Sequence, residues 1–387
     1  MLLIKNAHIR PVVGPELDNG CLLIEDGKIA ALAPSLAPPS DTEVLDAGGR
    51  LVTPGCIDAH CHIGLDNECM RWEGMDYNET TDPVTPQLRA IDSINPQDEA
   101  FGLALQGGVT AACTGPGSSN VVGGTFAVLK LAGNCVDDMV LRFPAAMKCA
   151  FGENPKNFYG QQQKTTPVTR MAVAALLREL LFRTKRYRSD QLQGKEPPFD
   201  MKLEAMIPVI EGRVPLKCHA HRADDIMTAI RIAKEFNLQI TLDHCTDGAL
   251  VAKELAKAGY PVLIGPTMGQ KSKIELRNKS FSTPRVLAEA GLSVSIVTDA
   301  PVIPLQYLTL CAGLAVRAGL APEEAWKAIT IHPARCLDVD RRIGSLEAGK
   351  DADLVIWTDD PLTVLGAEAY MTFVEGQIVY RAALLPD

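Results

Sequence analysis

LVTPGCIDAHCHIG, residues 51–64, is the stretch that decides the fold and the place of the functional residues. Its apolar start, interrupted by Pro54 and Gly55, predicts a short buried strand. Alternate residues of a strand point to the same face, so His60 and His62 direct two imidazoles to one point while Cys61 faces away. Two neutral imidazoles at one strand end form half of a metal site. An isolated His-x-His pair is often incidental, so this interpretation depends on the rest of the chain.

Length and composition limit the classes of protein to consider. A chain of 387 residues has room for an α/β barrel of about 250 residues and a smaller unit. No apolar run is long enough to span a membrane, and residues 1–10 do not look like a signal peptide, which predicts a soluble cytoplasmic protein. The eleven scattered cysteines are typical of reduced core residues. The net charge of −9 argues against nucleic-acid and membrane partners. As partners we expect a small-molecule substrate and, separately, a second copy of the chain in a homo-oligomer.

Both ends of the chain are rich in predicted strands. At the N-terminal end, residues 2–9 and 21–33 are predicted to form strands, with Asp26 and Gly27 in a hairpin turn. At the C-terminal end, residues 351–360 and 373–381 are also predicted to form strands, with Glu375 and Gly376 in a turn. The residues between these two ends show a different pattern of secondary structure. We therefore predict a small β-sandwich domain built from residues 1–52 plus 345–387.

The middle of the chain alternates apolar strands with amphipathic helical stretches, a pattern typical of βαβ units around a parallel sheet. Eight strands are predicted, and the third is the weakest. They lie at residues 55–63, 108–115, 125–133, 141–151, 214–222, 239–247, 261–268 and 292–300. The predicted fold class is thus α/β, a TIM-like (β/α)₈ barrel over residues 53–344.

Most histidines of the chain fall at predicted strand ends. His219, His221 and His244 lie at the ends of the fifth and sixth strands, and Asp299 follows the apolar run of the eighth. Active sites of such barrels lie at the carboxyl ends of the strands. These side chains are therefore expected to meet His60 and His62 in one bowl.

The motifs also resemble those of a known family. They are VLDAGGRLVTPGCIDAHCHIG, KCHAHRADD, TLDHCTDG, VTDAP and ITIHPARCLDVDRRIGSLEAGKDADLVIW. Together they resemble the amidohydrolase superfamily of metal-dependent hydrolases, in its imidazolonepropionase-related branch, over nearly the whole chain. This resemblance implies a barrel with a β-sandwich from both termini.

The resemblance also implies roles for single residues. Metal ligands would be His60, His62, His219 and His244, and Asp299 would touch the metal and handle a proton. Nitrogen and carboxylate ligands favour Zn²⁺, with Fe, Mn or Ni as alternatives and one or two metals per chain.

Two assignments stay open on strands four and five. Lys148 lies where binuclear family members carry a carboxylated lysine, whose carbamate bridges two metals, whereas Glu153 offers a carboxylate ligand at the end of the same strand. His221 shares the parity of His219 and is assigned to the substrate or to support of the ligands. Asp243, beside His244, has the opposite parity and is expected to point towards the helices.

A basic segment follows strand four. Residues 154–200 hold nine Lys and Arg against four Asp and Glu. This segment would recognise an anionic group of the substrate, or else form a solvated helix or an oligomer contact. Lys156, Arg170 and Arg222 are the cations nearest to the inferred site in sequence.

The resulting hypothesis is a metal-dependent amidohydrolase. Metal-activated hydroxide would attack an amide, cyclic amide or dipeptide, with Asp299 as base and then as acid. The alternatives are a deaminase of a heterocycle and a non-catalytic assembly protein of the same fold. The intact set of histidines with Asp299 argues against the assembly protein.

Overall fold

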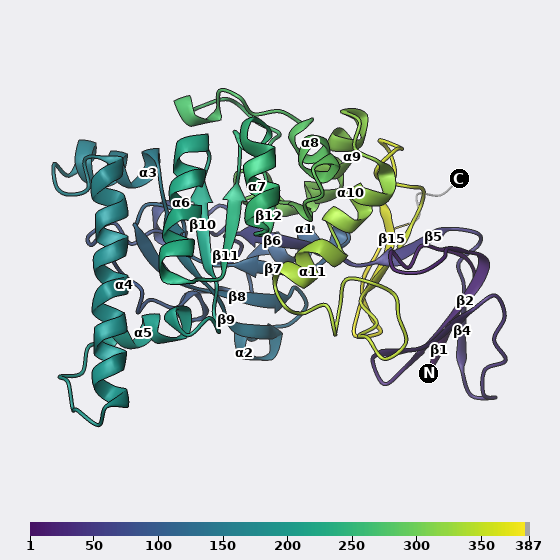
Figure 1. The fold of residues 1–387 in the computed structure, drawn as a ribbon. Helices are drawn as coiled ribbons and strands as arrows, with labels where there is room; N and C mark the ends of the chain where they lie inside the picture. The colour runs from purple at the N-terminus through teal and green to yellow at the C-terminus, as the bar shows by residue number, and fades with distance from the viewer. Residues whose placement is uncertain (384–387) are drawn as a thin grey trace.

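The computed structural model describes residues 1–383, and eight strands form a nearly closed barrel at its centre (Figure 1). Neighbours in the barrel follow chain order, from the first strand to the eighth. The strands are β6 (Cys56–Cys61), β7 (Val109–Thr114), β8 (Val122–Lys130), β9 (Val140–Ala150), β10 (Leu216–Ala220), β11 (Ile240–His244), β12 (Val262–Ile264) and β13 (Val294–Ile296). All eight predicted barrel strands are thus present.

The first and last strands are joined through Asp58 and the residues that follow β13. The amide and hydroxyl of Thr298 donate to Asp58 Oδ2 at 2.8 and 2.6 Å, and the amide of His60 donates to Asp58 Oδ1 at 2.9 Å. The amide of His62 donates to the carbonyl of Ala300 at 2.7 Å. Burial raises the pKa of the Asp58 carboxyl to about 6, although these hydrogen bonds oppose the shift.

The direction of the third strand corrects the expectation of a wholly parallel sheet. β8 pairs antiparallel with both β7 and β9, whereas the pairs from β9 to β13 are parallel. Residues 115–121 alone connect β7 to β8, and a parallel crossover needs about a dozen residues or more. The short connection therefore forces a hairpin.

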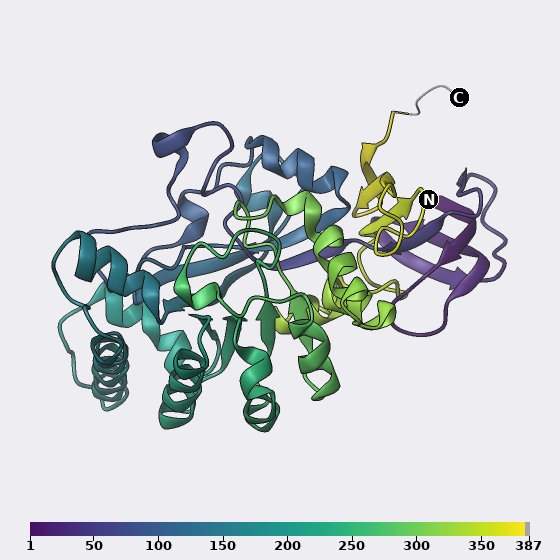
Figure 2. The same ribbon diagram turned by 90° about the horizontal axis from the view of Figure 1, so that it is seen from above.

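Helices cover the outer face of the barrel, and the helical row α4, α6 and α7 is seen end-on in Figure 2. In α6, buried residues recur at spacings of three and four, from Ile226 through Ala229, Ile230 and Ala233, so one stripe of the helix faces the strands. The helices are α1 (Glu99–Gln106), α2 (Val136–Met139), α3 (Glu153–Pro155), α4 (Arg170–Leu192), α5 (Met201–Ile210), α6 (Ala223–Phe236), α7 (Ala252–Ala258), α8 (Thr283–Glu289), α9 (Leu308–Arg317), α10 (Pro322–Ala328) and α11 (Ile331–Cys336). Within residues 1–383, no helix has the length and apolar character needed to cross a membrane.

The two ends of the chain share a second sheet beside the barrel, where the purple and yellow segments meet in Figure 1. The sheet runs in the order β16-β15-β14-β5-β1-β2-β3, and β4 also pairs with β1. Its strands are β1 (Leu2–Ile9), β2 (Leu17–Glu25), β3 (Lys28–Ala33), β4 (Glu43–Asp46), β5 (Leu51–Pro54), β14 (Leu354–Trp357), β15 (Ala369–Val374) and β16 (Gln377–Arg381). Pairing of both termini is confirmed, whereas the two layers of a β-sandwich and the domain boundaries stay predictions.

A buried lysine joins the barrel to the terminal sheet. Lys130 ends β8, and its side chain is 7% exposed. Its Nζ donates to Asp351 at 2.6 Å, to Glu375 at 2.9 Å and to Asp353 at 3.2 Å. Burial by itself would lower the pKa of Lys130, but the three carboxylates outweigh burial and raise the pKa.

We predict that Lys130→Met lowers the free energy of unfolding by about 3–5 kcal/mol, because the substitution leaves the buried carboxylate of Asp353 without the one cation that pairs with it within residues 1–383. Lys28→Met is the matched control: Lys28 binds the same Asp351, but its side chain is 54% exposed, so its loss should cost below about 1 kcal/mol. Urea unfolding followed by circular dichroism measures both values. Equal losses in the two variants would contradict the assigned role of Lys130.

Candidate metal centre

The first group of possible metal ligands lies at the ends of β6 and β13. It consists of His60, His62 and Asp299, each offering one atom within 4.8 Å of the others. Asp299 Oδ1 lies 3.3 Å from Nε2 of both histidines. The Asp299 side chain is 15% exposed, whereas His60 is fully buried, so the carboxylate is the member that faces the opening.

Backbone carbonyls fix the orientation of two histidines. His62 Nδ1 lies 2.7 Å from the carbonyl of Gly115, and His244 Nδ1 lies 2.6 Å from the carbonyl of Gly265. A carbonyl only accepts, so each Nδ1 carries a proton, and a ring bound as a metal ligand presents an unprotonated Nε2. Nε2 of His62 therefore turns its lone pair towards a carboxylate oxygen of Asp299 that accepts no hydrogen bond within residues 1–383. Two lone pairs that face each other suit a shared cation, so these residues fit a divalent metal.

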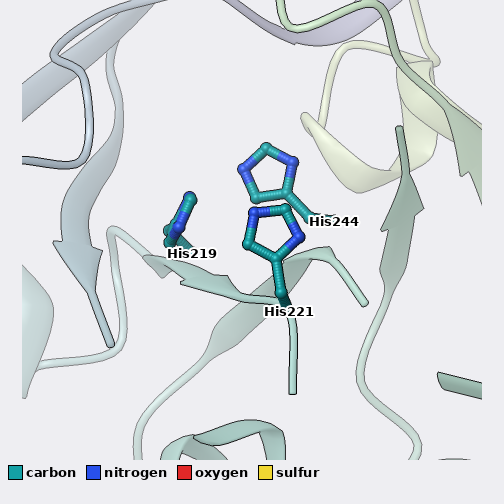
Figure 3. A group of neighbouring side chains, drawn as sticks. All are labelled: His219, His221 and His244. Atoms are coloured by element: carbon teal, nitrogen blue, oxygen red, sulfur yellow. The ribbon is translucent and has the colours of Figure 1, made fainter. Parts of the chain in front are cut away.

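The second group comprises His219, His221 and His244, shown in Figure 3. The rings of His221 and His244 stack at 14° with centroids 4.7 Å apart, and His219 stands edge-on to both. Burial lowers the pKa of His221 to about 3 and lowers that of His219 and His244 well below the ordinary value. All three rings are thus neutral at pH 7, as metal ligands must be.

A carboxylate that the sequence analysis missed approaches this group. Glu275 lies in the short helix η5 (Ile274–Leu276), in the loop after β12, and is 1% exposed. Its Oε1 lies 3.9 Å from His219 Nε2 and 3.8 Å from His221 Nε2, and it accepts no hydrogen bond within residues 1–383. No local motif marks this residue, because the loop brings it to the site only through the tertiary fold.

The prediction that Asp243 points towards the helices was wrong. Asp243 Oδ2 lies 3.0 Å from His60 Nδ1 inside the barrel, and its Oδ1 lies 3.4 Å from Lys217 Nζ. The reason is backbone geometry: His244 has a φ of +74°, which interrupts the alternation of the strand. Asp243 and His244 therefore both face inward.

Comparisons with known proteins agree with this geometry. The chain is 39% identical to an amidohydrolase of known structure from Thermotoga maritima MSB8, with a TM-score of 0.95 over 99% of this chain and 100% of that one. The chain belongs to the amidohydrolase family. The family model for amidohydrolases matches residues 202–379.

Two curated amidohydrolase relatives are more distant. The amidohydrolase tasK of Hapsidospora irregularis is 29% identical over 92% of this chain, which spans 39% of that protein's length. An imidazolonepropionase of Bacillus velezensis (strain DSM 23117 / BGSC 10A6 / LMG 26770 / FZB42) is 24% identical over 81% of this chain and 77% of its own. The resemblance to the imidazolonepropionase-related branch is thus confirmed.

Lys148 lies between the two histidine groups of this amidohydrolase. It is fully buried on β9, and its Nζ lies 3.3 Å from His60 Nε2. Burial lowers the pKa of the Lys148 amine. Burial is also the main cause of the low pKa of His60, His219 and His244, to which Lys148 adds in its protonated form.

Glu153 follows the end of strand four by three residues, after a bend at Gly152. β9 ends at Ala150, Gly152 has a φ of +84°, and Glu153 begins the short helix α3 instead of continuing the strand. Its amide donates to Glu275 Oε2 at 3.1 Å. Within residues 1–383, its carboxylate forms no ion pair with a histidine, so Glu275 is the glutamate nearest to the second group.

We predict that Asp243→Asn lowers metal affinity by about 10–100-fold, because the carboxylate that orients His60 is lost. Asp247→Asn is the control: it removes the same charge from the loop that follows β11, but Asp247 contacts Ala223 and Asn278 rather than His60. Competition with a chelator measures the affinities. Equal affinities in the two variants would show that Asp243 does not support the ligand.

Proposed function

We propose that this chain is a metal-dependent hydrolase that cleaves a carbon–nitrogen bond of a small amide, cyclic amide or dipeptide. One observation carries the proposal. At the open end of the barrel, Nε2 of His60 and Nε2 of His62 both face Asp299 Oδ1, which accepts no hydrogen bond within residues 1–383. Membership of the amidohydrolase family supports the same reaction class.

In this proposal the metal centre is held by residues at the ends of four barrel strands. The protein ligands there are His60 on β6, His62 just after it, His219 on β10, His244 on β11 and Asp299 after β13. A divalent ion, with Zn²⁺ favoured by the nitrogen and carboxylate donors, supplies Lewis acidity that activates water near neutral pH. Fe, Mn and Ni remain alternatives that metal analysis would separate.

Asp299 is proposed to move the proton. Its Oδ1 lies 3.3 Å from Nε2 of both His60 and His62, and its side chain is the member of that group that faces the opening. In this proposal the carboxylate accepts a proton from water and returns it to the leaving nitrogen. His221, whose Nδ1 lies 2.8 Å from the Thr246 hydroxyl, presents Nε2 to the same space and is proposed to contact the substrate.

For strand four, we propose that Lys148 carries a carbamate that bridges two metals. Three observations support it: Lys148 is fully buried, the low pKa of its amine favours the neutral form that reacts with CO₂, and its Nζ lies beside His60 between the two histidine groups.

A substrate screen tests the reaction class. Metal-loaded protein would be incubated with amides, lactams, dipeptides and aminated heterocycles, and released carboxylate or ammonia would be measured. Cleavage of an amide supports the proposal, whereas release of ammonia from a heterocycle alone would identify a deaminase. A homo-oligomeric state and a cytoplasmic location stay predictions.

We predict two metals per chain and a loss of one or both in Lys148→Ala, because the shared carbamate oxygens are removed. Small carboxylic acids should restore part of the activity by replacing the bridge. Metal analysis and assays with added acetate or propionate check both results.

The control for this prediction is Glu153→Gln, which should keep both metals. One metal per chain with an unmodified Lys148 would rule out the carbamate. Loss of metal in Glu153→Gln would instead assign the strand-four ligand to the glutamate.

A further inference from the structure

The arginines named in the sequence analysis are occupied by other partners. Arg170 binds the buried carboxylate of Asp225 at 2.9 and 3.0 Å, and Arg222 binds Asp224 at 2.9 and 2.8 Å. Both contacts lie around the start of α6. These two guanidinium groups therefore hold the framework together, and an anion-binding role requires a different cation.

Lys273, in the loop after β12, is a cation at the metal centre. Its Nζ donates to Asn154 Oδ1 at 2.6 Å, and within residues 1–383 it forms no ion pair with a carboxylate. Even Glu275, two residues further along the same loop, turns its carboxylate to His219 and His221 instead. The half-buried side chain of Lys273 is thus held by a neutral amide and not by a carboxylate.

Asn154 links this cation to the histidines. Its Nδ2 donates to the Ser118 hydroxyl at 2.6 Å and lies 3.4 Å from His219 Nε2. Three loops, which follow β7, β9 and β12, thus place a hydroxyl, an amide and an ammonium side by side next to a proposed metal ligand. Burial is the main cause of the low pKa of His219 and His221. The nearby charge of Lys273 lowers both pKa values further.

We propose that Lys273, oriented by Asn154, binds a carboxylate of the substrate next to the scissile bond. The inference rests on the proposed hydrolysis of amides and specifies its substrate class: amides that carry a carboxylate close to the cleaved nitrogen, such as N-acyl amino acids and dipeptides. An ammonium group has three donors, so two remain for the substrate after the bond to Asn154.

The charge balance favours a monoanion over a phosphate group. A phosphate is usually bound by several donors or by a guanidinium fork. Here the Lys273 ammonium is held by an amide and not by a guanidinium fork, and the carboxylate of Glu275 follows two residues later. This arrangement matches one negative charge and would repel a second.

The test compares acids with their neutral counterparts. Metal-loaded protein is titrated in a calorimeter with N-acetyl derivatives of glycine, alanine, leucine and proline and with the carboxamides of the same compounds. The variant is Lys273→Gln. The control is Lys271→Gln, which removes an exposed lysine of the same loop whose Nζ donates to the carbonyl of Arg277.

We expect the wild type and Lys271→Gln to bind at least one acid about 10–100-fold more tightly than its amide, the range typical of a hydrogen bond to a charged group. In Lys273→Gln this preference should disappear while amide binding stays unchanged. The proposal is overturned if no acid is preferred by the wild type, or if the preference survives in Lys273→Gln.

Hydrolysis of the same compounds is followed separately. Binding with the expected preference but without cleavage would contradict the proposed reaction and leave the carboxylate site intact. Cleavage of acids and amides with equal KM values would contradict the carboxylate site and leave the reaction intact. Where acids are cleaved, Lys273→Gln should raise KM with little change in kcat, since the lysine contacts a part of the substrate that does not react.

Discussion

A buried array of charges inside the barrel is the constraint on which the site depends. Lys217 and Asp243 are almost fully buried, and the carboxylate is shared between the Lys217 ammonium and His60 Nδ1. Removal of one member from such an array costs about 3–5 kcal/mol, because the remaining charge is left without compensation in a medium of low polarity. The array also holds the imidazole of His60 with Nε2 towards the opening. The same contacts therefore stabilise the interior and orient a ligand.

The sequence predicted the strands and the histidines because both depend on local patterns. Alternation placed His60 and His62 together, and all eight barrel strands were found from apolar runs. The direction of β8 was missed, since it depends on the length of one connection rather than on composition. The inward turn of Asp243 was also missed, because one positive φ at His244 interrupts the alternation that the prediction assumed.

The remaining parts of the site lie on loops, where sequence carries no periodic signal. Glu275 and Lys273 belong to a segment without an apolar pattern, yet they lie beside His219. Conversely, Arg170 and Arg222 seemed close in sequence but bind carboxylates at the start of α6. Proximity along the chain therefore does not identify the cations of the site, since loop residues reach it according to how three separate connections fold over the barrel mouth.

The terminal sheet has a consequence for how the protein is made on the ribosome. β5 pairs with β14, and Thr53 lies opposite Val355, about 300 residues later in the chain. At about 5–20 residues per second, the N-terminal strands emerge roughly 15–60 s before their C-terminal partners. During that interval one edge of β5 has free backbone groups that can pair with other nascent chains. The newly synthesised chain therefore depends on early barrel formation or on chaperones to protect this edge until its last strands arrive.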